Sequence, residues 1–341
     1  MKRAIILDPK MRAEFVHRFD EINVEYVKRV DRLRTVRLEP RILPYTKDRM
    51  KELIDKLHKD ENMPLDAATA QIMERFARPA YFVQDDSFDT RNTPSTSELI
   101  DNTVNKAKSL IEKALPSVGR INLRNHRLSW VGTGWVIAEN ILVTNRHVAT
   151  EFAGHEGDSF VFIRTAGQTA KAELDTVREY KSQKEKLYKI RKVLWIAPPS
   201  FEHDIAFLSI DKESNYNNPQ PPPIDLMDIS SFEDIPNDHW IAVIGYPGRS
   251  SDDITDQQLI FDGIYDVKRI QPGQIKAKNS AAGIVEHDAS TLNGNSGSVV
   301  LDLTSGKAIG LHFLGILGER RINKAVAAPV IRELLYKHVL S

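Results

Sequence analysis

Apolar residues recur at steps of three and four through the first 115 positions of the chain, among many charged residues. This spacing places one apolar face along a helix. The first series is Phe15, Phe19, Ile22, Tyr26 and Val30. The same spacing within 50–57, 66–77 and 98–115 predicts three further helices, the last of which ends before Pro116.

Polar and proline-rich stretches separate these helices. The segment 38–46 carries two prolines and is predicted to be a connection, and 78–97 is predicted to be a linker. Asp66 is placed to cap the third helix, and Ser95 with Glu98 matches a capping box for the fourth.

The pattern changes after Pro116 to short runs of β-branched and aromatic residues between turn signals. These runs are 118–124, 130–138, 140–145, 159–164, 204–210, 240–246, 259–267, 298–303 and 308–315. Since most of them follow one another without a helix, the pattern favours an all-β barrel or sandwich over a doubly wound parallel sheet. A helical pattern returns in 327–341. We therefore divide the chain into a helical region, 1–115, and a mainly β domain, 116–341.

Composition excludes several functions. Lysine plus arginine equals aspartate plus glutamate, 47 each, so no net charge favours nucleic acid or an anionic membrane. The lysine-rich stretch 181–192 is interpreted as a solvated loop or hairpin tip. The chain has no cysteine, and its first residues hold only a four-residue apolar run, Ala4–Leu7, so we expect a cytoplasmic protein. No HExxH motif or glycine-rich phosphate loop is present, and we expect neither a metal nor a cofactor.

The segment 291–300, TLNGNSGSVV, carries the first candidate chemistry. Gly294 and Gly297 flank Ser296 and permit a tight turn that presents its hydroxyl. The backbone amides of Gly294 and Ser296 would then be available to a developing oxyanion. A simple turn between two strands is the alternative reading of the same residues.

A serine nucleophile needs a base and a group that orients the base. His147 stands where an apolar strand runs into a turn, in NILVTNRHVA. Asp204 opens the strand DIAFLSI after a turn-like segment. The order His147, Asp204, Ser296 is one of the known chain orders of a catalytic triad, and it is that of two-barrel proteases.

Together, GTGWVIAENILVTNRHVA, HDIAFLSI, IAVIGYPG and GNSGS followed by GLHFLG resemble the trypsin/chymotrypsin-like serine peptidases, in particular a bacterial branch similar to glutamyl endopeptidases. The resemblance covers about 116–341. It implies a chymotrypsin-like double β-barrel with a C-terminal helix, preceded here by the helical region. It also implies that His147 is the general base, Asp204 its orienter and Ser296 the nucleophile, with an oxyanion hole at Gly294 and Ser296.

The resemblance also suggests a specificity pocket. Ser290 lies six residues before Ser296, where trypsin-like members carry an aspartate, so a basic substrate side chain would find no counter-charge. Thr291 and His312 match positions that hold a substrate carboxylate in glutamyl endopeptidases, and Gly315 would leave the pocket open. Acidic residues before the scissile bond are thus the expected substrates.

Two functions remain open at this point. The first is a serine endopeptidase that acts on protein or peptide substrates, with the helical region regulating it, recruiting a protein partner or only supporting the barrel. A bacterial defence or stress effector is one context for such a protease. The second is a catalytically idle protease-fold module that binds peptides and uses the helical region as an interface.

Overall fold

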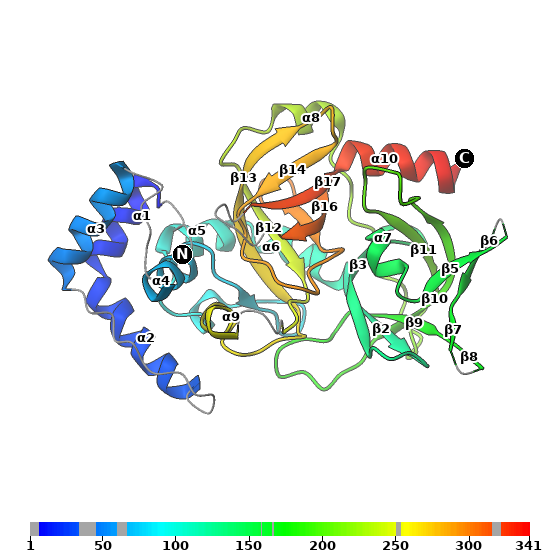
Figure 1. Cartoon of the computed structure of the whole chain (residues 1–341), viewed down its shortest axis with the longest axis horizontal. Coiled ribbons are helices and arrows are strands. Elements are labelled where there is room, and N and C mark those ends of the chain that lie inside the picture. The colour runs from blue at the N-terminus through cyan, green and yellow to red at the C-terminus, as the bar shows by residue number, and fades with distance from the viewer. Residues whose placement is uncertain are drawn as a thin grey trace.

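Two closed six-stranded β-barrels lie side by side and form the larger part of the molecule (Figure 1). The computed structural model describes residues 7–33, 46–59, 67–157, 159–165, 167–249, 254–315 and 322–341. The N-terminal helices pack against the second barrel, on the side away from the first (Figure 1). The fold is mainly β, a chymotrypsin-like double barrel with a helical N-terminal region, as the sequence predicts.

The first barrel has the strand order β10-β11-β4-β3-β2-β9. Its strands are β2 (Val118–Arg124), β3 (Trp130–Ala138), β4 (Ile141–Thr144), β9 (Lys171–Asp175), β10 (Leu187–Ile196) and β11 (Ala206–Ile210). Inward side chains such as Val136, Leu142 and Leu208 are fully buried in a core separate from that of the rest of the molecule. Two small hairpins project from this barrel (Figure 1): β5 (Ala153–Glu156) with β6 (Ser159–Phe162), and β7 (Arg164–Thr165) with β8 (Gln168–Thr169).

The second barrel has the strand order β13-β12-β15-β16-β17-β14 and closes through a β13–β14 pairing. Its strands are β12 (Trp240–Gly245), β13 (Arg269–Asn279), β14 (Ile284–His287), β15 (Val299–Asp302), β16 (Ala308–Gly315) and β17 (Asn323–Ala327). A seventh strand, β1 (Tyr81–Phe82), pairs with the start of β13. This barrel and the N-terminal helices share one hydrophobic cluster, in which Phe76 and Ile100 join Val243 and Ile270.

The helices of the N-terminal region follow the predicted apolar spacing. They are α1 (Pro9–His17), α2 (Phe19–Leu33), α3 (Lys47–Lys59), α4 (Ala67–Ala77), α5 (Glu98–Lys106) and α6 (Lys108–Ala114). Phe15 of α1 packs edge-on against Phe76 of α4, with ring centroids 5.0 Å apart. The first predicted helix is in fact two, divided at Arg18, and the fourth is divided at Ala107.

Two local predictions in this region are wrong. The cap of α5 is Ser97, whose side chain accepts from the Leu99 amide, whereas Ser95 has a positive φ of 68° and lies outside the helix. The predicted linker 78–97 is largely buried and contributes β1 and a short 3₁₀ turn (Thr90–Asn92). Asp66 and most of the predicted connection 38–46 lie outside the described residues.

Further differences concern the β domain. The sequence predicts a strand over 259–267, but this run forms the end of helix α9 (Ile254–Phe261) and the turn that follows. Part of the predicted loop 181–192 belongs to β10. Strand β13 was not predicted because Pro272 and Gly273 interrupt it. On one edge β13 pairs with β1 up to Ile270 and with β14 from Ile275, so Pro272 lies opposite neither strand.

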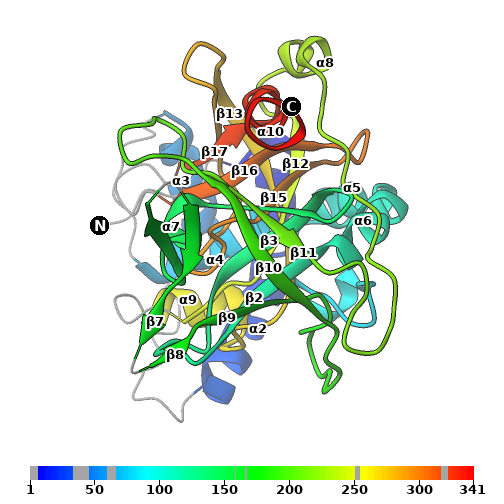
Figure 2. The same ribbon diagram turned by 90° about the vertical axis from the view of Figure 1, so that its right-hand side faces the viewer.

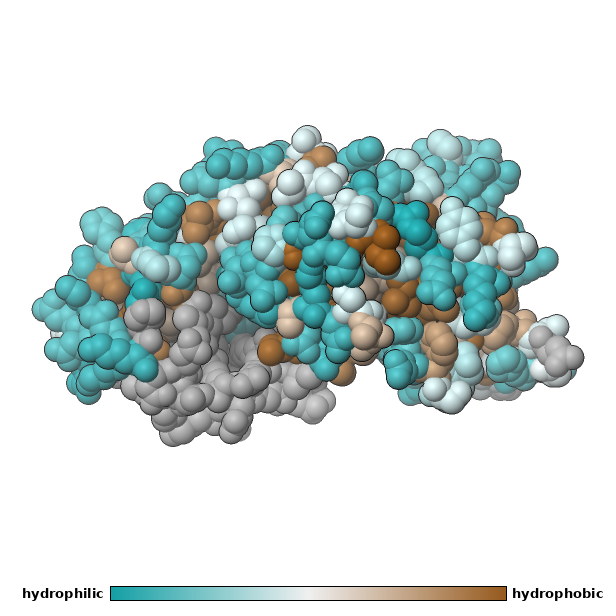
Figure 3. Space-filling view, turned by 90° about the horizontal axis from the view of Figure 1, so that it is seen from above, coloured by the Kyte–Doolittle hydropathy of each residue, from teal (hydrophilic) through white to brown (hydrophobic). Residues whose placement is uncertain are grey.

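The remaining helices are α7 (Arg146–Ala149), α8 (Ile229–Asp234) and α10 (Ala328–Leu335). Helix α10 begins directly after β17 and continues as a π-helical turn to Leu340, which places the C-terminus near the top of the molecule (Figure 2). The face seen in Figure 3 is mostly hydrophilic with scattered apolar residues.

No helix within the described ranges has both the length and the apolar character to cross a membrane.

Candidate active site

The antiparallel register of β4 and β11 brings His147 and Asp204 together. Thr144 at the end of β4 pairs with Ala206 at the start of β11, so the residues just beyond these two strand ends are neighbours. Asn145 Nδ2 donates to the Asp204 carbonyl over 2.8 Å, and His147 follows on α7. The His147 amide donates to Asp204 Oδ1 at 3.0 Å, and its ring Nδ1 lies 2.5 Å from Asp204 Oδ2.

This geometry keeps Asp204 ionised. Burial alone would raise the pKa of its carboxyl, but the hydrogen bonds and charge of His147, with the nearby Arg146, outweigh burial and lower the pKa. Both carboxylate oxygens are occupied by His147, which fixes the ring orientation. The imidazole is held at Nδ1, and its Nε2 is left for a substrate or a nucleophile.

The loop between β14 and β15 presents Ser296. Gly294 and Gly297 have φ values of +89° and +86°, a region that side chains with a Cβ rarely occupy. A Cβ on Gly297 would lie 2.0 Å from the Thr133 carbonyl oxygen. Only glycine therefore fits at this position, because both the backbone conformation and the space require it.

Thr133 of β3 connects this loop to the first barrel. Its amide donates to the Ser296 carbonyl at 2.9 Å, and its hydroxyl donates to the Gly294 carbonyl at 2.8 Å. Its own carbonyl accepts from Thr144 Oγ1 at 2.7 Å, one residue before the segment that carries His147. Thr133 is completely buried. It therefore sets the distance between the serine loop and the histidine segment.

The amides of Gly294 and Ser296 donate to no protein group in the described part of the chain, so both can receive an oxyanion. Ser296 Oγ and His147 form no hydrogen bond to each other among the described residues. Their segments nevertheless meet at Gly132: a Cβ there would lie 2.8 Å from Val148 Cγ2 and 3.0 Å from the Ser296 carbonyl oxygen. Hydrogen bonds between a catalytic serine and histidine are often long in ligand-free enzymes.

His312 of β16 lies beside the serine loop. Its carbonyl accepts from the Gly297 amide at 2.9 Å. Its buried ring Nδ1 is 3.2 Å from Nε2 of His287, which is also buried. Burial lowers the pKa of His287 to about 4 and, together with the charges of His287 and His147, lowers that of His312 well below the usual value. Both rings are therefore neutral near pH 7.

The other predicted pocket residues divide into two groups. Thr291 and Gly315 lie together, because Thr291 Oγ1 is 2.8 Å from Asn323 Oδ1 and a Cβ on Gly315 would lie 3.1 Å from the same oxygen. Ser290 is directed elsewhere. It is 6% exposed, and its hydroxyl lies 2.8 Å from Glu74 Oε1 and 3.0 Å from the Arg78 carbonyl, both in the N-terminal region.

Several residues that shape the site were not predicted. Thr133 belongs to the quoted GTGWVIA motif, but its role depends on contacts between segments far apart in sequence. The Trp130 ring lies against the serine loop, since a Cβ on Gly294 would be 2.5 Å from its Cη2. Gln271 pairs with Asn295, next to Ser296. Nothing in the local sequence around Trp130 or Gln271 marks these contacts.

Two closed barrels with a His–Asp pair and a glycine-flanked serine loop between them define the class of trypsin-like serine peptidases. A family model for the trypsin-like peptidase domain matches residues 132–311, more than half of the chain, and the chain belongs to that family. It is thus a serine-type endopeptidase by class. No curated protein has a sequence that matches this chain.

Solved structures of similar proteins include bacterial proteases. A serine endoprotease from Yersinia pestis is 17% identical, with a TM-score of 0.46, and the alignment covers 70% of this chain and 66% of that one. The active form of the Rv3671c protease from M. tuberculosis is 19% identical, with a TM-score of 0.43 and coverage of 69% and 86%. The HtrA-type protease AlgW with a decapeptide is 18% identical, with a TM-score of 0.45 and coverage of 69% and 67%.

Proposed function

We propose that this chain hydrolyses peptide bonds through an acyl-enzyme, with Ser296 as nucleophile, His147 as general base and Asp204 as the group that orients it. The observation that carries the proposal is the double contact of Asp204 with the His147 amide and ring. In the first step His147 Nε2 takes the Ser296 proton while Oγ attacks the scissile carbonyl. The imidazolium then protonates the leaving amine, and water repeats the sequence to release the acid.

The amides of Gly294 and Ser296 are proposed to bind the oxyanion of the tetrahedral intermediate. Their support comes from Thr133, which holds the carbonyls of the same two residues and so fixes the peptide planes before and after the plane that carries the Ser296 amide. Donors that are already oriented stabilise the developing charge without reorganisation at the moment of reaction.

The test is reaction of the purified full chain with a fluorophosphonate, which forms a covalent bond only with an activated serine. Wild type is expected to be labelled, and a folded Ser296→Ala variant is not. A second serine of the same loop, Ser298, is buried behind Asn295, and labelling mapped to it rather than Ser296 would contradict the assignment. A folded wild-type protein that is not labelled would favour the idle, peptide-binding module.

We further propose a preference for acidic residues before the scissile bond, as in the glutamyl-endopeptidase branch. His287 Nδ1 has no partner among the described residues. A buried lone pair without a partner costs less than a buried N–H without one, so His287 is assigned as the donor from Nε2 to His312. His312 then keeps its proton on Nε2, where a neutral imidazole can donate to a substrate carboxylate.

A peptide library with all residues varied before the scissile bond tests this preference. Cleavage after Glu or Asp is expected, and His312→Phe should reduce it more than cleavage after other residues. Glu74 provides the competing arrangement, since its carboxylate lies against Ser290, the position at which trypsin-like members carry an aspartate. Cleavage after Lys or Arg that is lost in Glu74→Gln would replace the acidic preference with a basic one.

For the helical region, 1–115, we propose a regulatory or protein-interaction role in a cytoplasmic protease of bacterial defence or stress responses. The absence of cysteine fits a reducing compartment, and the hydrophobic cluster that the helical region shares with the second barrel would allow that region to influence the protease domain. Fractionation of cells that express the full chain tests the location. Survival of cells with wild type or Ser296→Ala under phage or heat challenge tests the role.

A further inference from the structure

The end of α4 and the residues that follow it are attached to the segment that leads into the serine loop. Arg78 donates to both carboxylate oxygens of Asp288, from Nε and Nη2, at 2.7 Å each. Glu74 Oε1 lies 2.8 Å from Ser290 Oγ. On the opposite side, Asn323 Nδ2 donates to the Ala289 carbonyl at 2.6 Å. The segment 288–290 is thus held between β17 and the helical region.

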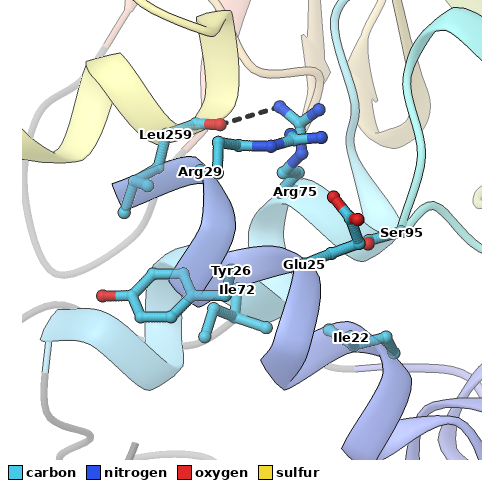
Figure 4. A pocket seen from close by; sticks show the side chains of 8 residues that line it. All are labelled: Ile22, Glu25, Tyr26, Arg29, Ile72, Arg75, Ser95 and Leu259. Carbon is cyan, nitrogen blue, oxygen red and sulfur yellow. Dashed lines mark hydrogen bonds between the residues drawn. The ribbon is translucent and has the colours of Figure 1, made fainter. Parts of the chain in front are cut away.

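A second attachment joins the helical region to helix α9 (Figure 4). Arg75 of α4 donates from Nη1 to the carbonyls of Leu259 and Ile260, at 2.7 and 3.0 Å, and approaches Asp262. Arg29 of α2 pairs with the same Asp262 at 3.1 Å. The cavity left between these helices is about 20 Å³, enough for about one water molecule. This junction is therefore a packed contact and not a ligand pocket.

Both attached segments border the serine loop. The segment 288–290 runs directly into it. Ile260 and Phe261 of helix α9 form a hydrophobic cluster with Ala80, and Leu292 at the start of the serine loop packs against this cluster. The turn at Tyr246–Gly248 also contacts the loop, since the Gly248 amide donates to the Asn293 carbonyl at 2.6 Å. A Cβ on Gly294 would lie 2.5 Å from the Tyr246 carbonyl oxygen. Movement of either attached segment would therefore move the residues proposed to form the oxyanion hole and the substrate pocket.

The contacts between the helical region and the second barrel include buried charged residues. Arg75 and Arg78 are 6% and 2% exposed. Strand β1 then extends the second barrel at β13, and Arg269 of β13 donates to the Ala80 carbonyl at 2.9 Å. We expect a cover that is released from a cleft to make fewer buried ion pairs, because breaking such a pair leaves an uncompensated charge in the protein interior.

We propose that residues 74–82 are a built-in positioning clamp, which holds the substrate pocket and the serine loop in the catalytically competent conformation. The clamp rests on the proposed peptidase function. Arg75 and Arg78 are positioning residues and touch no reacting atom. The helical region on this view is required for activity and does not block the cleft.

The test compares Arg78→Gln with Arg91→Gln, in the full chain. Arg91 also pairs with an aspartate, Asp89, but its side chain is 89% exposed, so it controls for loss of a charge in the same region. Three quantities are measured: the rate of fluorophosphonate labelling, KM and kcat for a cleaved peptide, and the unfolding midpoint. The double variant Arg78→Gln/Asp288→Asn, which removes both charges and keeps a hydrogen bond possible, is the rescue.

We expect Arg78→Gln to label about 10- to 100-fold more slowly and to show a higher KM, as displacement by about 1 Å can produce. The double variant should recover part of both losses, and Arg91→Gln should match wild type. If Arg78→Gln does not fold, Arg75→Lys takes its place, since a lysine keeps the charge but lacks the planar fork by which Nη1 reaches the two carbonyls and Nη2 reaches Asp262.

A folded Arg78→Gln variant that labels and cleaves at least as well as wild type overturns the clamp, and faster labelling would instead make the helical region an inhibitor. Failure of the proposed function looks different. In that case folded wild type and folded Arg91→Gln are also unlabelled. This result would contradict the proposed function and, with it, the clamp.

Discussion

The side-chain amides of Asn295 and Gln271 pair in both directions in the buried core of the second barrel. Gln271 Nε2 donates to Asn295 Oδ1 at 3.0 Å, and Asn295 Nδ2 donates to Gln271 Oε1 at 2.9 Å. Both residues are completely buried, and Asn295 directly precedes Ser296. The neutral pair anchors the serine loop to β13 without an ion pair.

This pair leads to a prediction for Gln271→Leu. Leucine fills a similar volume but removes the acceptor of Asn295 Nδ2 in the interior and leaves Asn295 Oδ1 with the Ser298 hydroxyl alone, which should cost about 1–3 kcal/mol of unfolding free energy. Fluorophosphonate labelling should slow as well, because the loop loses its anchor. The exposed Gln168→Leu in β8 is the control for the same chemical change. Urea unfolding gives the stability, and equal values for the two variants would contradict the role of the pair.

The glycine of the serine loop supports a second prediction. Gly297→Ala must place a Cβ within 2.0 Å of the Thr133 carbonyl oxygen and hold alanine at a φ of +86°. We expect loss of labelling and a lower unfolding midpoint. Gly154→Ala has open space around its Cβ, with no atom within 4 Å, and should leave both measurements unchanged. Normal labelling of Gly297→Ala would mean that the loop adopts another conformation in solution.

The sequence predicts most strands of the first barrel closely, and the reason is local. Strands β2 and β3 have the predicted bounds because turn residues on both sides interrupt a β-rich run. The run 259–267 has similar composition but lies in a connection that packs on α4, and tertiary contacts make its first part helical. Strand β13 accommodates Pro272 because β12 pairs with it on one edge, while β1 and β14 pair with the other edge only before and after the proline.

Local sequence patterns predict the site residues as well, but not the residues that position them. The motifs around His147, Asp204 and Ser296 can be found in the sequence because each is a short local pattern. The partners that position them come from elsewhere in the chain: Thr133 from β3, Gln271 from β13 and Glu74 from α4. Ser290 illustrates the limit, since its place in the motif predicts a pocket wall and the structure directs its hydroxyl to the helical region.

The proposed triad predicts a graded loss of turnover. Ser296→Ala should lower kcat by about 10⁶-fold, because no other group can form the acyl-enzyme. Asp204→Asn should lower it by about 10⁴-fold, since asparagine cannot hold the His147 ring in the same tautomer. Steady-state hydrolysis of a peptide found by library screening gives both values. Losses below tenfold for either variant would show that the hydrolysis arises from another site or a contaminant.

The pair of Asp288 with Arg78 predicts how stability depends on pH. Burial would raise the pKa of Asp288, but the charge and hydrogen bonds of Arg78, with Lys276, outweigh burial and lower the pKa to about 2. In the unfolded chain the value is about 3.9. A carboxyl whose pKa is lower in the folded state stabilises fully above the unfolded value, and this contribution is lost as pH falls toward 2.

The difference in unfolding free energy between wild type and Asp288→Asn should therefore shrink by about 2 kcal/mol between pH 5 and pH 2. Asp85→Asn is the matched control, because the Asp85–Lys184 pair has side chains 65% and 75% exposed and surface pairs contribute little. Its difference from wild type should stay nearly constant over the same range. A flat profile for Asp288→Asn would show that the Arg78 contact does not persist in solution, and the clamp would lose its main attachment.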